Sequence, residues 1–262
     1  MGRTVPAVAR ALDILELFLD GTDNLSAPEI MARTSLPRTT VHELVTTLTQ
    51  RSYLATVPER AHRYRLGVRA FQLGSAYAER IDLAREGQHI AREVAEACDE
   101  TVHLAVLDGA GVVYIAKVDS THSVRMVSAV GRRLPAHCTA VGKMLLSGLP
   151  AEAFTALFPP DRPLPAMTPG SITSVRQLER ELAEIRLRGT AAESCESNPD
   201  VACVAAPVFD HRGRMIAAMS ISAPISRWSA ERQEAWATLV ADGAARLSTV
   251  LGHRPTRRVA EV

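Results

Sequence analysis

The chain has 262 residues, a formal net charge of +1, and a composition that is 47% hydrophobic and 23% charged. This length suits two domains, and the apolar content can supply a buried core in each. No apolar run is long enough to span a bilayer and the N-terminus lacks a signal-peptide pattern, so we expect a cytoplasmic protein without membrane contact. The four cysteines follow no C-x-x-C spacing and are expected to be reduced thiols.

The N-terminal segment predicts a helix. Thr4–Asp20 repeats apolar residues at steps of three and four, and the polar residues 21–24 end the pattern. Such a stripe can be the core face of a small domain, or it can pair with a second copy of the chain.

Two short helices joined by a tight turn are predicted in Leu25–Leu54. Ser26 and Glu29 have the spacing of a capping box, which begins a helix. Pro37 then separates this helix from the next, because the residue before a proline avoids the α conformation. The second helix carries one apolar stripe, formed by Val41, Leu44, Val45 and Leu48.

The opposite face of this second helix carries Arg38, Thr39, His42, Glu43 and Thr46. These short or planar hydrogen-bonding side chains suit base edges and phosphates in a DNA major groove. The alternative is a solvated helix face of the kind found in any small helical domain.

A hairpin is predicted directly after this helix. Tyr53–Val57 and Arg63–Leu66 are short strand-like runs around residues 58–62, an arrangement typical of the wing of a winged helix-turn-helix. The tip would place Arg60 and His62 near a DNA backbone or minor groove, although an exposed turn is the simpler interpretation. The complete set of expected DNA contacts is Ser26, Arg38, Thr39, Thr40, His42, Glu43, Thr46, Arg60 and His62.

The remaining chain predicts a linker helix and a second domain. From Thr101 the apolar period changes to two, which is typical of strands. The expected elements are a linker helix at Gly67–Arg85, a helix at Gln88–Ala97, strands at Val102–Leu107, Val112–Val118 and Val124–Ala129, a loop at 131–135, helices at Thr139–Ser147 and Ser174–Arg188, strands at Val201–Phe209 and Met215–Ser222, and a helix from Ser229 to Leu251.

These elements predict an α+β chain of two domains. Residues 4–66 form a mostly helical winged helix-turn-helix, residues 67–85 a linker helix, and residues 86–253 a domain built on one antiparallel sheet with flanking helices.

Several sequence stretches together resemble the IclR family of bacterial transcriptional regulators. They are LPRTTVHELVTTL, YRLGVRAFQLGS, GRRLPAHCTAVGKMLL, RGTAAES with VACVAAPVFD, and MSISAPISR. The resemblance covers nearly all of the chain and implies that the second domain is a GAF-like effector-binding domain. It also implies a homodimer or homotetramer that binds double-stranded DNA at a palindromic operator, with repression favoured over activation and no cofactor required.

The resemblance further implies a pocket for a small effector, expected to be a carboxylate. Met126 and Leu134 match its apolar patch, and Ala140 and Val141 match a pair of backbone donors at a helix start. Side chains that close on the ligand match Glu193, Cys203, Ser220 and Ser222. The spacing of the two serines does place both hydroxyls on one face of a strand, and helix N-termini attract anions. Alternatively, the hydroxyls satisfy local backbone and Cys203 is a small buried apolar residue.

Three departures from the family pattern are expected to matter. Glu43 stands where the family usually has arginine, and its carboxylate could accept from a cytosine amine. Ser35 and Ser52 replace common glycines, which questions the tightness of both turns. Asn198–Asp200 replaces a glycine-containing loop beside Glu193.

Two other classes of protein are alternatives for this sequence. An enzyme could use His137 and Cys138, with Glu193, Cys195 and Cys203, as a nucleophile or metal site. These spacings fit no zinc pattern, and the adjacent pair would point in opposite directions if extended, so we expect no catalytic and no metal-ligating residues. A sensor without a DNA role would show no salt-sensitive binding to its own promoter region.

Overall fold

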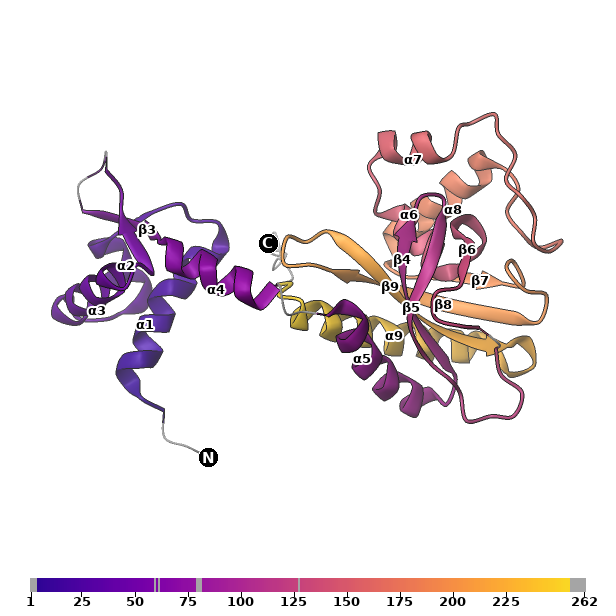
Figure 1. Ribbon diagram of the computed structural model, residues 1–262, viewed down its shortest axis with the longest axis horizontal. Helices are drawn as coiled ribbons and strands as arrows, with labels where there is room; N and C mark the ends of the chain where they lie inside the picture. Colours follow the sequence, from indigo (N-terminus) through magenta and orange to yellow (C-terminus); the bar gives the residue numbers. More distant parts are fainter. Residues whose placement is uncertain (1–3, 59, 61, 79–81, 127, 255–262) are drawn as a thin grey trace. The chain divides into compact units, whose positions relative to one another are not determined.

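The computed structural model describes residues 4–58, 60, 62–78, 82–126 and 128–254. The chain divides into two compact units, residues 1–81 and residues 82–262, each with its own core (Figure 1). Within the described ranges, no helix combines the length and apolarity that a membrane crossing needs.

The first unit is a small helical domain with a three-stranded sheet. Its strands are antiparallel in the order β1-β3-β2, and Ile14, Ile30, Val41 and Leu54 are fully or almost fully buried in its core. The elements are α1 (Pro6–Glu16), the 3-10 turn η1 (Leu17–Asp20), β1 (Leu25–Ser26), α2 (Ala27–Thr34), α3 (Arg38–Gln50), β2 (Leu54–Thr56), β3 (Arg63–Leu66) and α4 (Val68–Ala78).

The capping box predicted at the start of α2 is present. The backbone N–H of Glu29 donates to the Ser26 hydroxyl at 3.4 Å, and the Glu29 carboxylate accepts from the Ser26 backbone N–H at 2.6 Å. The Ser26 N–H and hydroxyl both donate to the Glu29 carboxylate and lower its pKa, the backbone bond being the largest cause and the Arg63 guanidinium a smaller one. The start of α2 is therefore fixed by local hydrogen bonds.

Both turns that lack the expected glycine nevertheless adopt the left-handed conformation. Ser35 ends α2 with φ 56°, and Ser52 follows α3 with φ 61°. A residue with a side chain holds this conformation at a cost of about 1 kcal/mol. The turns thus keep a tight geometry without glycine.

The second unit is built on a six-stranded antiparallel sheet in the order β6-β5-β4-β9-β8-β7. α5 and α9 pack on one face of this sheet, while α6 packs on the other with α8 against it (Figure 1). The elements are α5 (Leu83–Cys98), β4 (Thr101–Asp108), β5 (Gly111–Val118), β6 (Arg133–Pro135), the 3-10 turn η2 (Ala136–Cys138), α6 (Ala140–Ser147), α7 (Ala151–Leu157), α8 (Val175–Arg188), β7 (Ala191–Ser194), β8 (Val201–Phe209), β9 (Met215–Pro224), the 3-10 turn η3 (Ile225–Arg227) and α9 (Ala230–Val250).

The strand predicted at Val124–Ala129 is wrong, and the loop predicted at 131–135 is wrong over its last three residues. The described residues of 124–129 form no strand, whereas Arg133–Pro135 pairs with β5 as the edge strand β6. Just before β6, the Gly131 N–H donates to the Tyr114 carbonyl of β5, and the Tyr114 N–H donates to the Arg132 carbonyl. Met126 is therefore buried although it lies in a loop, and the alternating apolar pattern around it does not mark a strand.

The predicted linker helix at Gly67–Arg85 is also not one helix. α4 covers Val68–Ala78, and Asp82 begins α5 by accepting hydrogen bonds from the backbone N–H groups of Ala84 and Arg85. Residues 79–81 lie outside the described part. The cap at Asp82, near the end of the predicted span, is the local signal that a new helix begins there.

Gly67, where β3 passes into α4, gives a test of the close packing in the first unit. A Cβ atom at Gly67 would lie 2.2 Å from the Ser52 carbonyl oxygen, whereas a Cβ at Gly74 in α4 would meet nothing within 4 Å. We expect Gly67→Ala to lower the free energy of unfolding of this unit by about 1–3 kcal/mol. The control Gly74→Ala should raise it by up to about 1 kcal/mol, because alanine favours a helix interior. Scanning calorimetry of both variants measures the difference, and equal effects would contradict this packing.

Candidate functional site

The α3 helix presents one polar face to solvent. Val41 and Val45 are buried at 0% and 2% exposure, which turns the other side of the helix outward. Of the residues expected to contact DNA, Thr40 is half-buried, and the exposed ones on this helix are Arg38, Thr39, His42, Glu43 and Thr46. The helix thus presents a cation, hydroxyls, an imidazole and a carboxylate on one surface.

A hollow of about 890 Å³ joins part of this face to the wing. Arg38, Thr39 and His42 of α3 line it together with His62, which lies at the wing tip with φ 65°. Ala27, Pro28 and Met31 of α2 and Tyr64 of β3 complete its lining. The structure therefore brings four of the predicted residues to one concave surface, while Arg60 is exposed elsewhere on the tip.

Ser26 is committed to a structural role. Its hydroxyl and backbone N–H both bond to Glu29, and the side chain is half-buried. Arg63, which the sequence analysis did not single out, bonds to Asn24 and forms an ion pair with Glu29 at 3.0 Å. The base of the wing is thereby attached to the start of α2.

The apolar residues predicted to line an effector pocket lie in one cluster of the second unit. Met126, Leu134, Ala140 and Val141 are each at most 6% exposed and share this cluster with Tyr114. Ala140 and Val141 lie in the first turn of α6. The Thr139 hydroxyl caps this turn by accepting from the Gly142 backbone N–H at 3.1 Å.

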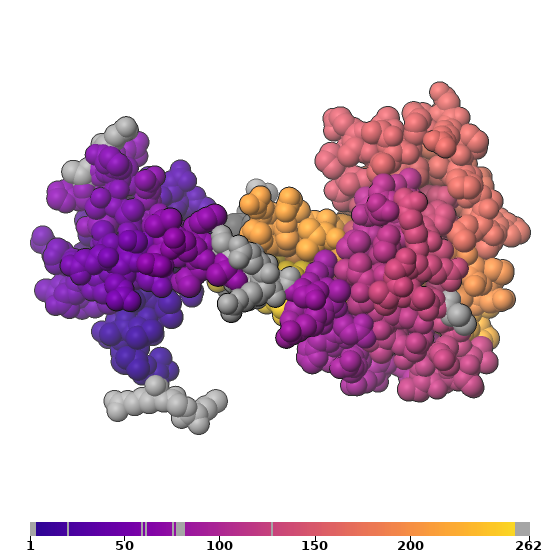
Figure 2. All heavy atoms as spheres, viewed as in Figure 1, coloured from indigo at the N-terminus to yellow at the C-terminus, as the bar shows by residue number. Residues whose placement is uncertain are grey.

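In the space-filling view, the visible surface of this unit comes mostly from the segment between α5 and α8, coloured magenta to salmon (Figure 2).

The polar residues of the same predicted set lie on neighbouring strands. Cys203 of β8 is the direct cross-strand partner of Glu193 in β7 and of Ser222 in β9, and Ser220 is two residues from Ser222 on the same face. Glu193 is 3% exposed, and burial raises its pKa. Its carboxylate accepts from the Glu196 backbone N–H at 2.9 Å and the Ser197 hydroxyl at 3.1 Å.

His103 joins this set, and the sequence analysis missed it. Its ring is fully buried, stacks on Tyr114 at 4.4 Å, and bonds to the Ser222 hydroxyl at 3.3 Å and the Ser128 hydroxyl at 2.6 Å. Burial, with the Lys117 cation as a smaller cause, lowers the pKa of His103 to about 3. The neutral ring has one donor and one acceptor nitrogen, so it connects Ser222 to the loop before β6.

Lys143 and Glu196 are a second feature absent from the prediction. Lys143 is 1% exposed, and its Nζ lies 2.6 Å from the Glu196 carboxylate. The other oxygen of that carboxylate is buried with no hydrogen-bond partner among the described residues. Because the Glu196 backbone N–H bonds to Glu193, this ion pair holds the loop that orients the Glu193 carboxylate.

The glycine-free loop beside Glu193 closes through a side chain. The Asn198 amide oxygen accepts from the Asp200 backbone N–H at 2.9 Å, and the Asp200 carbonyl accepts from the Ile225 N–H at 2.8 Å. The Asn198 side chain thus closes the turn in this loop, where the family pattern has a glycine.

The Cys138 thiol is poorly placed for nucleophilic chemistry. Burial raises the pKa of Cys138 to about 12, and its Sγ contacts the Pro135 carbonyl at 3.6 Å. Nε2 of the adjacent His137 bonds to the Pro165 carbonyl at 2.9 Å and not to this thiol. Over the described part of the chain, no three His, Cys, Asp or Glu residues are grouped so as to hold a metal ion.

The pH dependence of stability offers a test of His103. The unfolded ring takes up a proton below pH 6.5, whereas the native ring stays neutral down to about pH 3. Stability should therefore fall as pH drops through this window, with one such proton contributing about 1.4 kcal/mol per pH unit. His103→Asn should remove that part of the slope, and His122→Asn, at an exposed histidine, should retain it. Urea unfolding at several pH values measures the slopes, and equal slopes would contradict the assignment.

Comparison with known proteins identifies relatives along most of the chain. The model of the bacterial transcriptional regulator IclR C-terminal domain matches residues 75–249, and that of the IclR helix-turn-helix domain matches residues 7–58. The chain is 35% identical over 223 residues to the HTH-type transcriptional regulator XynR of Escherichia coli (strain K12), covering 85% of this chain and 88% of that protein. It is 32% identical over 250 residues to the transcriptional repressor IclR of the same organism, covering 95% and 90%.

Solved structures agree with these matches. The crystal structure of the Agobacterium tumefaciens repressor BlcR has a TM-score of 0.81 at 30% identity, and the match covers 97% of this chain and 100% of that chain. An IclR homolog from Microbacterium hydrocarbonoxydans, complexed with 4-hydroxybenzoate, has a TM-score of 0.58 at 26% identity, covering 94% and 98%.

Proposed function

The chain belongs to the IclR family of bacterial transcriptional regulators, and we propose that it is a repressor whose operator affinity changes when a small organic acid binds its second unit. The observation that carries this proposal is the polar face of α3, which opens beside the wing with Arg38, Thr39 and His42 at one concave surface. We place the protein in the bacterial cytoplasm, where its DNA target lies.

In this proposal α3 enters the major groove of a palindromic operator. Arg38 and Thr39 begin the helix, where backbone N–H groups also attract phosphates. His42, Glu43 and Thr46 then lie one to two turns further along, at positions that suit base edges. Glu43 repels phosphate but accepts from a cytosine amine, so we expect cytosine in the part of the operator that it faces.

The wing and the remaining hydroxyls complete the surface. Arg60 and His62 would meet the backbone or the adjoining minor groove, and phosphate contacts would supply most of the affinity. Thr40 is half-buried, so part of its side chain is accessible for a contact with DNA. Ser26 contributes by fixing the start of α2 rather than by a free hydroxyl.

We propose that the chain acts as a homodimer or a dimer of dimers. The first unit exposes Val5, Val8 and Leu12 along α1 at 59%, 57% and 52%. It also exposes Phe71 of α4 at 74%. Such apolar stripes suit contact with a second copy, which would present two α3 helices to successive major grooves about 34 Å apart.

We propose that the effector binds at the residues predicted to line its pocket, which include Ser222. The backbone N–H groups of Ala140 and Val141 begin α6, and a ligand carboxylate would accept hydrogen bonds there. Glu193 has a raised pKa, so its protonated form can donate to an anion instead of repelling it. The 4-hydroxybenzoate bound by the Microbacterium homolog is a carboxylate and supports this ligand class.

Regulation then follows from linkage. A ligand can change operator affinity only by as much as its own affinity differs between the DNA-competent and DNA-incompetent arrangements of the protein. His103 bonds to Ser222 and to Ser128, so occupation of the site would be felt in the loop that leads to β6.

Operator binding tests the first part of the proposal. We expect Arg38→Ala and Thr40→Ala to weaken binding to the operator by about tenfold, since each removes contacts worth roughly 1–2 kcal/mol. Arg180→Ala, at an exposed position of α8, is the control and should bind normally. Fluorescence anisotropy on the intergenic DNA beside the gene measures this. A loss of effector affinity with unchanged DNA affinity would reverse the roles of the two units.

Effector response tests the second part. We expect Ser222→Ala to abolish the thermal shift and the change in operator affinity produced by an active small carboxylate, while basal DNA binding stays normal. Ser123→Ala, in an exposed loop of the same unit, should respond like the unaltered protein. A Ser222→Ala protein that keeps the full response would show that the ligand binds elsewhere.

A further inference from the structure

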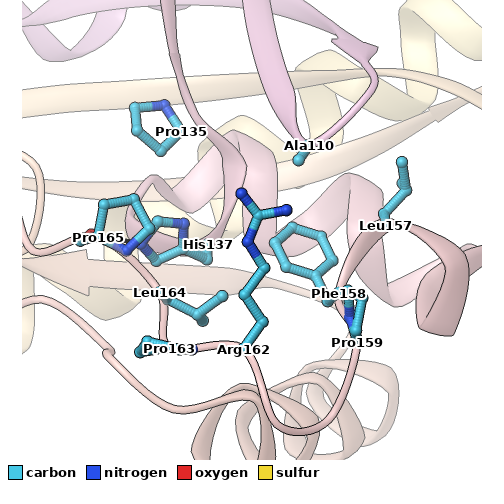
Figure 3. A pocket seen from close by; sticks show the side chains of 10 residues that line it. All are labelled: Ala110, Pro135, His137, Leu157, Phe158, Pro159, Arg162, Pro163, Leu164 and Pro165. Carbon is cyan, nitrogen blue, oxygen red and sulfur yellow. Dashed lines mark hydrogen bonds between the residues drawn. The ribbon is translucent and has the colours of Figure 1, made fainter.

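One pocket of the second unit contains none of the predicted effector residues. It has a volume of about 210 Å³ and lies between the β4–β5 turn, the end of β6, the end of α7 and the proline-rich loop that follows (Figure 3). Its lining consists of Ala110, Pro135, His137, Leu157, Phe158, Pro159, Arg162, Pro163, Leu164 and Pro165.

Arg162 places an uncompensated cation in this pocket. Figure 3 shows its side chain extending between Phe158 and His137 toward Ala110. Among the described residues its guanidinium has no hydrogen-bond or ion-pair partner, and the ten lining residues include no Asp or Glu. A guanidinium in this setting offers two parallel donors that match a carboxylate.

The backbone that carries Arg162 is well fixed. Its N–H donates to the Pro159 carbonyl at 3.1 Å, and Leu164 N–H donates to the Thr173 carbonyl at 2.9 Å. Prolines at 159, 163 and 165 restrict the remaining torsions. The loop therefore fixes the backbone at Arg162, whose side chain is exposed, so binding costs little backbone freedom.

The other walls are apolar and rigid. Phe158 is 4% exposed and stacks on Phe154 at 5.3 Å, and Leu164 is 7% exposed. His137 is 1% exposed, its Nε2 donates to the Pro165 carbonyl at 2.9 Å, and burial lowers its pKa. Burial therefore favours the neutral ring, and Arg162 supplies the charge for recognition.

The volume limits the size of a ligand. A cavity of about 150 Å³ holds benzene, and one water takes about 30 Å³. A pocket of about 210 Å³ has room for one six-membered ring or a short alkyl chain together with a carboxylate.

We propose that this pocket is a second small-molecule site, which binds a monocarboxylic acid with a compact apolar body. The carboxylate lies on the Arg162 guanidinium, and the apolar body packs against Phe158 and Leu164. The site is separate from the set around Ser222, and the proposal does not depend on the proposed function.

Benzoate titrated into the full-length protein labelled with fluorophenylalanine tests the proposal by ¹⁹F NMR. The chain has five phenylalanines, so the spectrum is simple, and Phe158→Leu assigns the reporter in the pocket. We expect the Phe158 signal to shift saturably, while that of Phe209, on β8, stays in place. Benzamide, which has the same ring but no charge, should not reproduce the shift.

Variants make the test specific to Arg162. Arg162→Gln should raise the benzoate concentration needed for half of the Phe158 shift by at least about tenfold. Arg180→Gln on α8 should leave it unchanged, and so should Ser222→Ala. The proposal is overturned if the Phe158 signal does not move, if benzamide acts like benzoate, if Arg162→Gln titrates normally, or if Ser222→Ala removes the shift.

Discussion

The packing of Val41 and Val45 in the core of the first unit determines which side of α3 meets solvent. Both valines share an apolar cluster with Ile14, Ile30 and Leu54, and burying each such side chain contributes about 1.5–3 kcal/mol. Rotating the helix to show another face would expose these side chains to water. The orientation of the polar face of α3 is therefore a by-product of core formation, and this face needs no direct support of its own.

In the second unit the comparable constraint is strand register. The pairing of β7, β8, β9 and β4 places Glu193, Cys203, Ser222 and His103 on one face of the sheet, although they are far apart in sequence. A shift of one residue in any of these strands would turn its side chain to the α5 and α9 face. Antiparallel pairing thus assembles a polar group that no local sequence pattern encodes.

Local signals in the sequence predicted most of the helices and strands. The Ser26–Glu29 capping box and the Ser174 start and Gly189 end of α8 depend on neighbours within a turn, and the structure has them. Val124–Ala129 failed because alternation alone does not reveal whether a partner strand is free. Three residues could not be found from sequence because their surroundings distinguish them. His103 lies between two hydroxyl groups, Lys143 beside a buried carboxylate, and Arg162 in a pocket whose lining has no acidic residue. The individual effector residues came from family resemblance, and they remain proposals.

Arg63 has a consequence for how such a domain can be altered. Its bonds to Asn24 and Glu29, with the pairing of β3 to β1, anchor the hairpin base independently of its tip. The Val57 N–H also bonds to the Arg63 carbonyl at 3.0 Å, so the backbone pairing of the hairpin continues as far as this pair. An insertion beyond the Val57–Arg63 pair would therefore leave the ladder and α3 in place, so the length of this hairpin and the position of the helix can change separately.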